Sequence, residues 1–222
     1  MLTLIANSCH KLGGECGADI KLGEVQLNED SKNFIPYSGN EELIFIDHLG
    51  IKHKLKSLNG RKLVNSRSIT RSLCLNELFD SQYEYYKSQS EEIAFTDSYG
   101  NQIFHINLST DILNDENTNE NTIYDLISVN LGVYNSNSNI EQLGGELRII
   151  TREIQGQLDQ NQMQNTQIRA NSIFIGDTIL YNRNFENIYK AKTYENSKNL
   201  YYNKSKGLIA FGSIDKFWVL DN

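Results

Sequence analysis

The chain has 222 residues, of which 39% are hydrophobic and 22% are charged, and its net charge is −7. This length fits a single all-β domain with a buried core, and the acidic balance argues against nucleic-acid binding, which requires a basic face. Twelve Tyr, nine Phe and one Trp favour strands, because aromatic side chains pack well on a pleated surface. No apolar run in the sequence is long enough for a transmembrane helix.

The first residues, MLTLIANSCH, form a short apolar run that ends at a cysteine. The run is too short for a complete secretory segment, and no Lys or Arg precedes it. Small residues, Ala6 and Ser8, stand three positions and one position before Cys9, and in this the stretch resembles the end of a bacterial lipoprotein signal. Residues 1–9 are therefore interpreted as the remnant of a signal with Cys9 as the lipidation site. The alternative is an ordinary apolar strand with an incidental cysteine.

Residues 10–20 are then a flexible tether, and residues 21–222 a single β-rich domain. If Cys9 carries lipid, Cys16 and Cys74 remain as an even pair, and we predict a disulfide between them in an oxidising compartment. It would close a loop of about sixty residues and stabilise the fold by about 4 kcal/mol on the chain-entropy model. Two free, buried thiols are the alternative. The spacing C-H-x5-C at the N-terminus lacks the pairing of structural zinc sites, so no metal site is predicted.

A strand–turn–strand phrase recurs along the chain. The copies are ELIFIDHLGIKHKL (42–55), EIAFTDSYGNQIFHINL (92–108) and, more weakly, GLIAFGSIDKFWVL (207–220). The first two share an Asp-x-x-Gly turn, formed by Asp47 and Gly50 and by Asp97 and Gly100. In such a turn the Asp side chain accepts a backbone hydrogen bond and the Gly adopts the positive φ that closes a hairpin. These copies predict the hairpins of a meandering antiparallel sheet.

The remaining segments also favour strands. Further strands are predicted at 147–154, 166–182 and 199–211, with a strand pair at 82–95 that turns around Ser88 to Ser90. Polar stretches at 112–122, 135–146 and 155–166 are predicted as exposed loops, and 73–83 is left open between helix and strand. The fold class is therefore all-β: an antiparallel meander that forms a sandwich or an incomplete barrel, with little helix.

No catalytic or cofactor signature is found. The sequence has no H-E-x-x-H, G-x-S-x-G, P-loop or G-x-G-x-x-G motif, so no catalytic residue and no cofactor is predicted. Of the four histidines, His10, His48, His53 and His105, the last two follow the turns of the first two hairpins and would approach each other if those hairpins are neighbours. We expect satisfied or exposed histidines rather than a site. Large aromatic residues near the C-terminus, Tyr202, Phe211 and Trp218, are expected to anchor the core.

The C-terminal fifty residues resemble a pattern of uncharacterised lipoproteins of Bacteroidota, with a YY-x-K-x-x-G-(I/L)-I-x-F phrase and a closing Trp. The matching positions are Phe185, Ile188, Tyr189, Tyr201, Tyr202, Lys204, Gly207, Leu208, Ile209, Phe211 and Trp218. FIPYSGNEELIFIDHLG, and Cys74 ahead of a Tyr-rich strand, are also similar to such proteins. The chain departs from the pattern in its truncated signal and in the missing Gly at 213–215. The resemblance implies a lipid-anchored, β-rich protein and no known activity.

The sequence therefore predicts a non-catalytic protein of the bacterial cell envelope, attached to a membrane through lipid on Cys9. The residues after Cys9, HKLGGE, lack the early acidic run that the resemblance links with surface display, which favours the periplasmic face. Its partner would be an envelope protein or an apolar ligand, and not a nucleic acid. One alternative is a carrier of lipid or another apolar ligand, with a cavity lined by strands such as 43–46. A second alternative is a hydrolase, with His53 or His105 next to a carboxylate or Ser.

Overall fold

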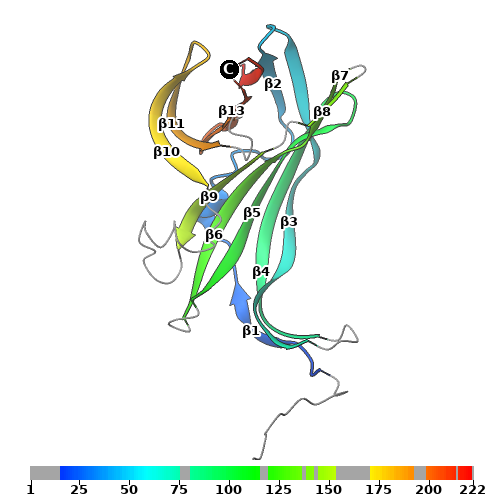
Figure 1. The fold of residues 1–222 in the computed structure, drawn as a ribbon, viewed down its shortest axis with the longest axis vertical. Coiled ribbons are helices and arrows are strands. Elements are labelled where there is room, and N and C mark those ends of the chain that lie inside the picture. The colour runs from blue at the N-terminus through cyan, green and yellow to red at the C-terminus, as the bar shows by residue number, and fades with distance from the viewer. Residues whose placement is uncertain are drawn as a thin grey trace, which may run out of the picture.

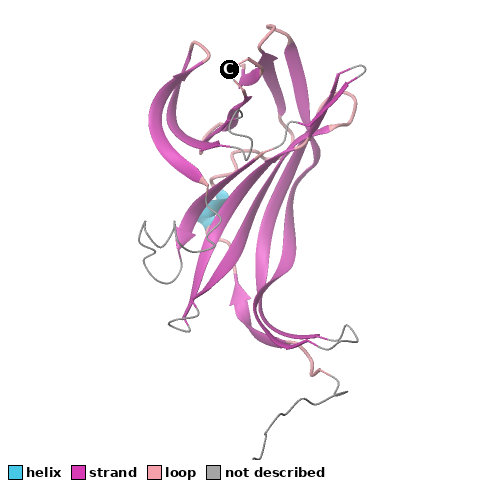
Figure 2. Ribbon diagram, in the orientation of Figure 1, coloured by secondary structure: helices cyan, strands magenta, loops and turns pink. Residues whose placement is uncertain are grey.

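The computed structural model describes residues 16–75, 81–115, 120–136, 139–142, 145–153, 171–192, 199–213 and 215–221. It is built almost entirely of strands (Figures 1 and 2). In chain order the elements are β1 (Ile20–Val25), α1 (Glu29–Lys32), β2 (Glu42–Asp47), β3 (Lys52–Leu75), β4 (Ser81–Thr96), β5 (Gln102–Asp115), β6 (Glu120–Leu131), β7 (Val133–Ser136), β8 (Asn139–Gln142), β9 (Glu146–Glu153), β10 (Ser172–Leu180), β11 (Arg183–Lys192), β12 (Asn199–Asn203), β13 (Gly207–Gly212) and β14 (Phe217–Leu220).

One large sheet contains these strands in the order β10-β11-β12-β13-β14-β2-β3-β4-β5-β6-β9, and β7 and β8 form a separate hairpin. Neighbours on this path are antiparallel, whereas β1 joins the side of β4 in parallel. The C-terminal β14 pairs with β2, so the two ends of the meander meet in the middle of the sheet. The sheet curls until it is nearly closed, and the predicted all-β incomplete barrel is confirmed.

The side chain of Asn171 links the two edge strands of the sheet, β9 and β10, where they approach each other. Asn171, just before β10, accepts a hydrogen bond from the N–H of Arg148 and donates one to the C=O of Glu146, both at 2.7 Å. The amide of Asn171 thus takes the place that a peptide group of a neighbouring strand would take beside β9.

Aromatic side chains fill the inside of the curled sheet. The ring of Phe45 lies 6.3 Å from that of Phe104 and 5.5 Å from that of Phe211, and Phe95 stacks on Phe104 at 4.8 Å. The expected aromatic anchors near the C-terminus belong to this core, since Tyr202, Phe211 and Trp218 are all buried. The three predicted hairpins are confirmed as β2–β3, β4–β5 and β13–β14.

Three local predictions were wrong because strand pairing overrides polar composition. Residues 82–95 belong to the single strand β4, and Ser88 faces Ser66 on β3, with 2.8 Å between their hydroxyl oxygens. The expected loop at 112–122 continues β5 as far as Asp115 and resumes in β6. The expected loop at 135–146 contains most of the β7–β8 hairpin. Each polar backbone is held extended by a ladder to a neighbouring strand. The loop at 155–166 lies outside the described residues.

Part of the sheet projects beyond the barrel. β2 pairs with β3 only as far as Lys56, and β5 pairs with β4 only from Ser90 onward, whereas β3 and β4 continue to pair as far as Leu75 and Ser81. With β1 beside β4, they form a three-stranded arm at the bottom of Figure 1. The name arm refers below to residues 19–25, 62–75 and 81–90. None of the described helices is long and apolar enough to cross a membrane.

Candidate functional site

The segment between β1 and β2, residues 26–41, runs across the inner side of the curled sheet and is called the inner segment. Leu27, Ile35 and Tyr37 are buried within the aromatic core. The ring of Tyr37 packs edge-on against Phe95 at 4.9 Å. This is the side of the sheet on which an incomplete barrel would hold a ligand, and the chain itself lies there.

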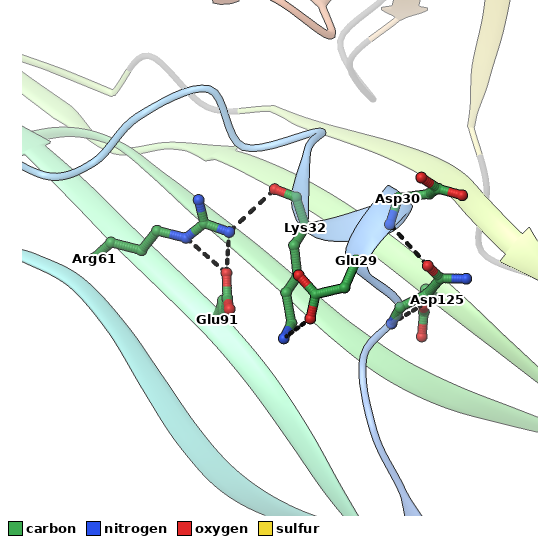
Figure 3. A network of polar contacts seen from close by, with 7 residues as sticks. Glu29, Asp30, Lys32, Arg61, Glu91 and Asp125 are labelled. Carbon is green, nitrogen blue, oxygen red and sulfur yellow. Dashed lines mark hydrogen bonds and ion pairs between the residues drawn. The ribbon is translucent and has the colours of Figure 1, made fainter.

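An arginine that is ion-paired within the sheet also holds the inner segment (Figure 3). Arg61 of β3 donates from Nε to the carboxylate of Glu91 on β4 at 2.6 Å, with a second contact from Nη2 to the same oxygen. Its Nη1 and Nη2 also donate to the carbonyl oxygens of Ile35 and Lys32, both at 3.1 Å. The guanidinium therefore satisfies a largely buried carboxylate and two backbone acceptors at once.

A bulge in β3 brings Arg61 to this position. Asn59 and Gly60 have φ of +65° and +72°, and the register with β4 shifts between Leu58 and Lys62. The inner segment passes so close to the bulge that a Cβ on Gly39 would overlap the backbone of Gly60 and Arg61. Only a glycine fits there, because Gly39 also has a positive φ of 103°.

A buried carboxylate fixes the start of α1. Asp125 of β6 is fully buried and accepts hydrogen bonds from the hydroxyl of Thr110 at 3.0 Å and from the N–H of Asn28 at 3.1 Å. The side chain of Asn28 in turn accepts from the N–H of Asp30 at 2.7 Å and caps the helix. Strand β6 therefore sets where the short helix begins, as Figure 3 shows.

Two tyrosines hold the end of the inner segment. The hydroxyl of Tyr37 donates to the carbonyl of Lys206 at 3.0 Å and accepts from the N–H of Leu208 at 2.9 Å. The hydroxyl of Tyr202 donates to the carbonyl of Phe34. Burial raises the pKa of both phenols well above their usual value, so both stay protonated and serve as structural hydrogen-bonding groups.

A pocket of about 230 Å³ lies against the β3 bulge, on the sheet of β3, β4 and β5. His105 and Glu92 line it, with Nε2 and Oε2 3.6 Å apart, together with Lys62 and Gln102. At this distance the two side chains attract each other without a direct hydrogen bond. The described residues that line the pocket include no Ser, Thr or Cys, so they offer acid–base and polar-binding groups but no hydroxyl or thiol nucleophile.

His53, near the start of β3, has a different carboxylate as its partner. Its Nε2 lies 2.9 Å from Asp47 Oδ2, and its ring stacks on Trp218 at 4.1 Å. Burial raises the pKa of Asp47, but hydrogen bonds from His53 and from the N–H groups of Ile51 and Leu49 outweigh it and hold the pKa below its usual value. The structure therefore gives His53 and His105 separate partners on different strands. His48 lies in an exposed turn, and His10 lies outside the described residues.

The two Asp-x-x-Gly turns have the same geometry. Asp47 Oδ1 accepts from the N–H groups two and four residues on, both at 2.9 Å, and Asp97 Oδ1 does the same. Gly50 and Gly100 have φ of +80° and +83°. These carboxylates are thus occupied by their own turns. Among the described residues, no three His, Cys, Asp or Glu side chains are placed to hold a metal ion.

The predicted lipidation site, Cys9, lies outside the described residues, while Cys16 is disulfide-bonded. Cys74 stands opposite Gln82 in the β3–β4 register, and the Gln82 side chain donates to the carbonyl of Ala18 at 2.9 Å. The backbone therefore carries Cys16 and Cys74 toward the same end of the arm. Their pairing stays a prediction, which a peptide map of the non-reduced protein would test.

Sequence reasoning did not identify the anchors of the inner segment. Arg61 and Glu91 are thirty positions apart, and Asn28 and Asp125 ninety-seven, so no local spacing connects them. Two local signals existed. Asn59-Gly60 within a strand pattern is typical of a bulge, and Asn28 before two acidic residues is typical of a helix start. Searches of protein-family models, curated proteins and solved structures found no match to the chain.

Proposed function

We propose that the protein is a non-catalytic component of the bacterial cell envelope, anchored by lipid at Cys9 and facing the periplasm, with a binding or structural role. The observation that carries the non-catalytic part is the inner segment, which lies where a carrier or a barrel enzyme would keep its site. The outer surfaces, and the arm above all, are then the parts left to meet a partner.

The alternative of an apolar-ligand carrier conflicts with the anchoring of the inner segment. Cavities that enclose a small ligand commonly measure about 300 to 1,000 Å³. Here a ligand would have to displace Ile35 and Tyr37 from the core and leave the pair of Arg61 and Glu91 with unsatisfied partners. Burying unpaired polar groups costs about 1–3 kcal/mol each, so displacement opposes ligand entry.

A fluorescent apolar probe tests this point. Titration of the purified protein with N-phenyl-1-naphthylamine is expected to show no saturable one-to-one binding. The variant Ile35→Ala, which opens space beside the core, serves as the positive control and is expected to gain binding. Saturable binding by the unaltered protein that is competed by a fatty acid would contradict the proposal and favour the carrier.

The pocket with His105 and Glu92 is the observation that favours the hydrolase alternative. Because no hydroxyl or thiol lines this pocket, the simplest hydrolase mechanism there would activate a water molecule through His105. We expect no turnover of p-nitrophenyl acetate or phosphate above that of His105→Ala. Turnover by the unaltered protein that disappears in both His105→Ala and Glu92→Gln would establish an enzyme.

The anchor is tested at the N-terminus itself. The gene is expressed with its upstream region in a Bacteroidota host, and the N-terminal peptide is weighed from membrane and soluble fractions. We expect a mature N-terminus at acylated Cys9 in membranes, and loss of this peptide in Cys9→Ser. An unmodified chain that retains Met1 in the soluble fraction would contradict the envelope assignment.

A further inference from the structure

The arm is an extended ribbon with no second layer of its own. Beyond the pair that Ser90 forms with β5, the ladder partners of β3 and β4 are only each other and β1, so the outer part of the ribbon projects from the main core (Figure 1). Tyr83, Tyr85 and Tyr86 are only half-buried along β4. Because no second layer of described residues covers the outer part of the arm, its side chains there are open to solvent or to a partner.

Apolar side chains are exposed on both faces of the arm. Leu63 and Ile69 share a face with Tyr85, and Val64 lies on the opposite face with Ser90, because paired residues point to the same side of a sheet. The exposed apolar residues of the arm are 37% to 58% accessible and comprise Ile20, Leu22, Leu63, Val64, Ile69 and Leu73. They make up six of the thirteen large apolar side chains that are exposed among the described residues, and groups of exposed apolar side chains mark interaction surfaces.

The arm also differs from the rest of the chain in charge. Its residues include five Lys or Arg and three Asp or Glu, a net charge of +2, in a chain whose net charge is −7. Lys21 and Lys87 flank Glu24, at 2.5 Å and 4.0 Å. The guanidinium of Arg67 lies 4.7 Å above the ring of Tyr85. An anionic lipid interface is the partner that matches this combination of basic, tyrosine and aliphatic side chains. At such an interface, tyrosines and aliphatic groups enter the headgroup region, and cations remain at the phosphates.

The chain leaves the structure toward its N-terminus at the far end of the arm. Asp19 accepts from the N–H of Tyr83 at 3.0 Å and pairs with Arg67 at 3.0 Å, so the described residue just before β1 lies against the outer part of the ribbon. Cys9 lies seven positions before Cys16, and a fully extended chain of this length spans at most about 25 Å. An acyl group on Cys9 would therefore hold this end of the molecule close to the bilayer.

We infer that the arm is a membrane-contacting element that binds anionic lipid headgroups through Lys21, Lys87 and Arg67 and inserts Leu63, Ile69 and neighbouring apolar side chains into the interface. The inference builds on the proposed envelope location, but the contact itself does not require the acyl group. It would supply a second attachment beside the acyl chains and orient the barrel away from the membrane.

The test uses the full chain with Cys9→Ser, which cannot be acylated. Co-sedimentation is measured with vesicles of phosphatidylcholine and with vesicles of phosphatidylcholine and phosphatidylglycerol at a ratio of about 7:3. We expect binding to the anionic vesicles and much weaker binding at 0.5 M salt, because screening shortens the reach of the surface charges.

Matched variants distinguish the arm from the general surface. Lys21→Gln with Lys87→Gln is expected to weaken vesicle binding about tenfold or more. Its control is Lys54→Gln with Lys56→Gln, which likewise removes two exposed lysines that flank one glutamate, Glu42. This control leaves the arm intact and is expected to bind within about twofold of the parent.

A second pair of variants tests the apolar contribution. Leu63→Ser with Ile69→Ser is expected to lower binding several-fold. Leu49→Ser with Ile51→Ser removes two comparably exposed apolar side chains from the β2–β3 turn, at the opposite end of the molecule, and is expected to have little effect (Figure 1). A circular-dichroism melt for each variant confirms that folding is retained.

Three outcomes would overturn the inference: no binding to anionic vesicles above the phosphatidylcholine level, equal losses in the arm variants and their controls, or an arm-dependent dimer that does not bind vesicles. The result at Cys9 is separate. A chain that retains Met1 in the soluble fraction refutes the lipid anchor whatever the vesicles show. Acylated Cys9 in membranes, together with no vesicle binding by the Cys9→Ser chain, refutes only the role of the arm.

Discussion

The barrel and the arm share the strands β3 and β4, yet apolar side chains of these strands are buried in the barrel and exposed in the arm. Where β3 and β4 pass through the barrel, Leu55 and Phe95 are fully buried, because the inner segment and the far side of the sheet cover them. Farther along the same strands, Leu63 and Ile69 remain more than half exposed. The backbone ladder is the same in both regions. Burial is therefore decided by whether a second layer lies over the strand, and the following predictions test that difference.

The largest effect is expected where the inner segment is attached to the barrel. Arg61→Ala leaves Glu91 as a mostly buried, unpaired carboxylate and removes the donors of two backbone carbonyls, and we expect a loss of about 3–5 kcal/mol in the free energy of unfolding. Urea denaturation followed by Trp218 fluorescence measures it. Ser31→Ala is the control in the same segment. Its buried hydroxyl has no hydrogen-bond partner, so the change is expected to be neutral or stabilising by up to about 1 kcal/mol. A loss below about 1 kcal/mol in Arg61→Ala would show that the inner segment is not held by this pair.

Gly207→Ala is expected to cost about 3 kcal/mol. A Cβ at this position would overlap the Tyr37 hydroxyl, and the φ of +79° is strained for any other residue. Gly100 has nearly the same φ, +83°, but nothing within reach of a Cβ, so Gly100→Ala is expected to cost only about 1 kcal/mol. Thermal melts of both variants measure the difference. Equal losses would mean that only φ matters and that the inner segment does not press on β13.

Tyr37→Phe removes one hydroxyl and leaves the N–H of Leu208 and the C=O of Lys206 without their partner. We expect a loss of about 1–3 kcal/mol, since buried groups left unpaired carry the desolvation cost. The corresponding change in the arm, Tyr85→Phe, is expected to cost less than about 0.5 kcal/mol because Tyr85 is only half-buried. Chemical denaturation of the two variants side by side makes the comparison. Similar losses would contradict the contrast between the two regions.

Glu41, just before β2, provides a pH-dependent contribution. Burial raises its pKa, but hydrogen bonds from the hydroxyl and N–H of Ser38 and from the N–H of Gly39 outweigh this and lower the pKa to about 2. Because the folded pKa lies below the unfolded value of 4.5, the carboxylate stabilises the fold above pH 4.5, and the contribution disappears as the pH falls toward 2. Glu41→Gln is expected to be about 1 kcal/mol less stable than the parent at pH 6, with the gap closing between pH 4.5 and 2. A gap that does not change with pH would refute this assignment.

The smallest effect is expected for the ion pair of the arm. Arg67 and Asp19 lie 3.0 Å apart, but 63% of the Arg67 side chain is exposed, so Arg67→Ala is expected to change stability by less than about 1 kcal/mol. Urea denaturation measured beside Arg61→Ala gives the contrast directly. A loss as large as that of Arg61→Ala would show that the arm is a stabilised part of the core rather than an exposed ribbon.

Several features followed from sequence reasoning. The alternation after Gly50 and the repeated Asp-x-x-Gly turns predicted the first two hairpins, because turn chemistry and side-chain period act over a few neighbouring residues. The turn and two of the loops that were predicted from polar composition were wrong. Ser88 and Asn114 are extended because β3 and β6 pair with them, and such pairing depends on residues far away in the chain.

What the sequence determined by itself is therefore local: strands, hairpin turns, aromatic core residues and the all-β class. Only the tertiary structure decided that residues 26–41 fill the inner side of the sheet, that Arg61 meets Glu91 there, and that the outer half of β3 stays exposed. The physical reason is that hydrogen-bonded turns and side-chain alternation are short-range. Burial and charge pairing arise only when a strand finds, or fails to find, another layer of the molecule above it.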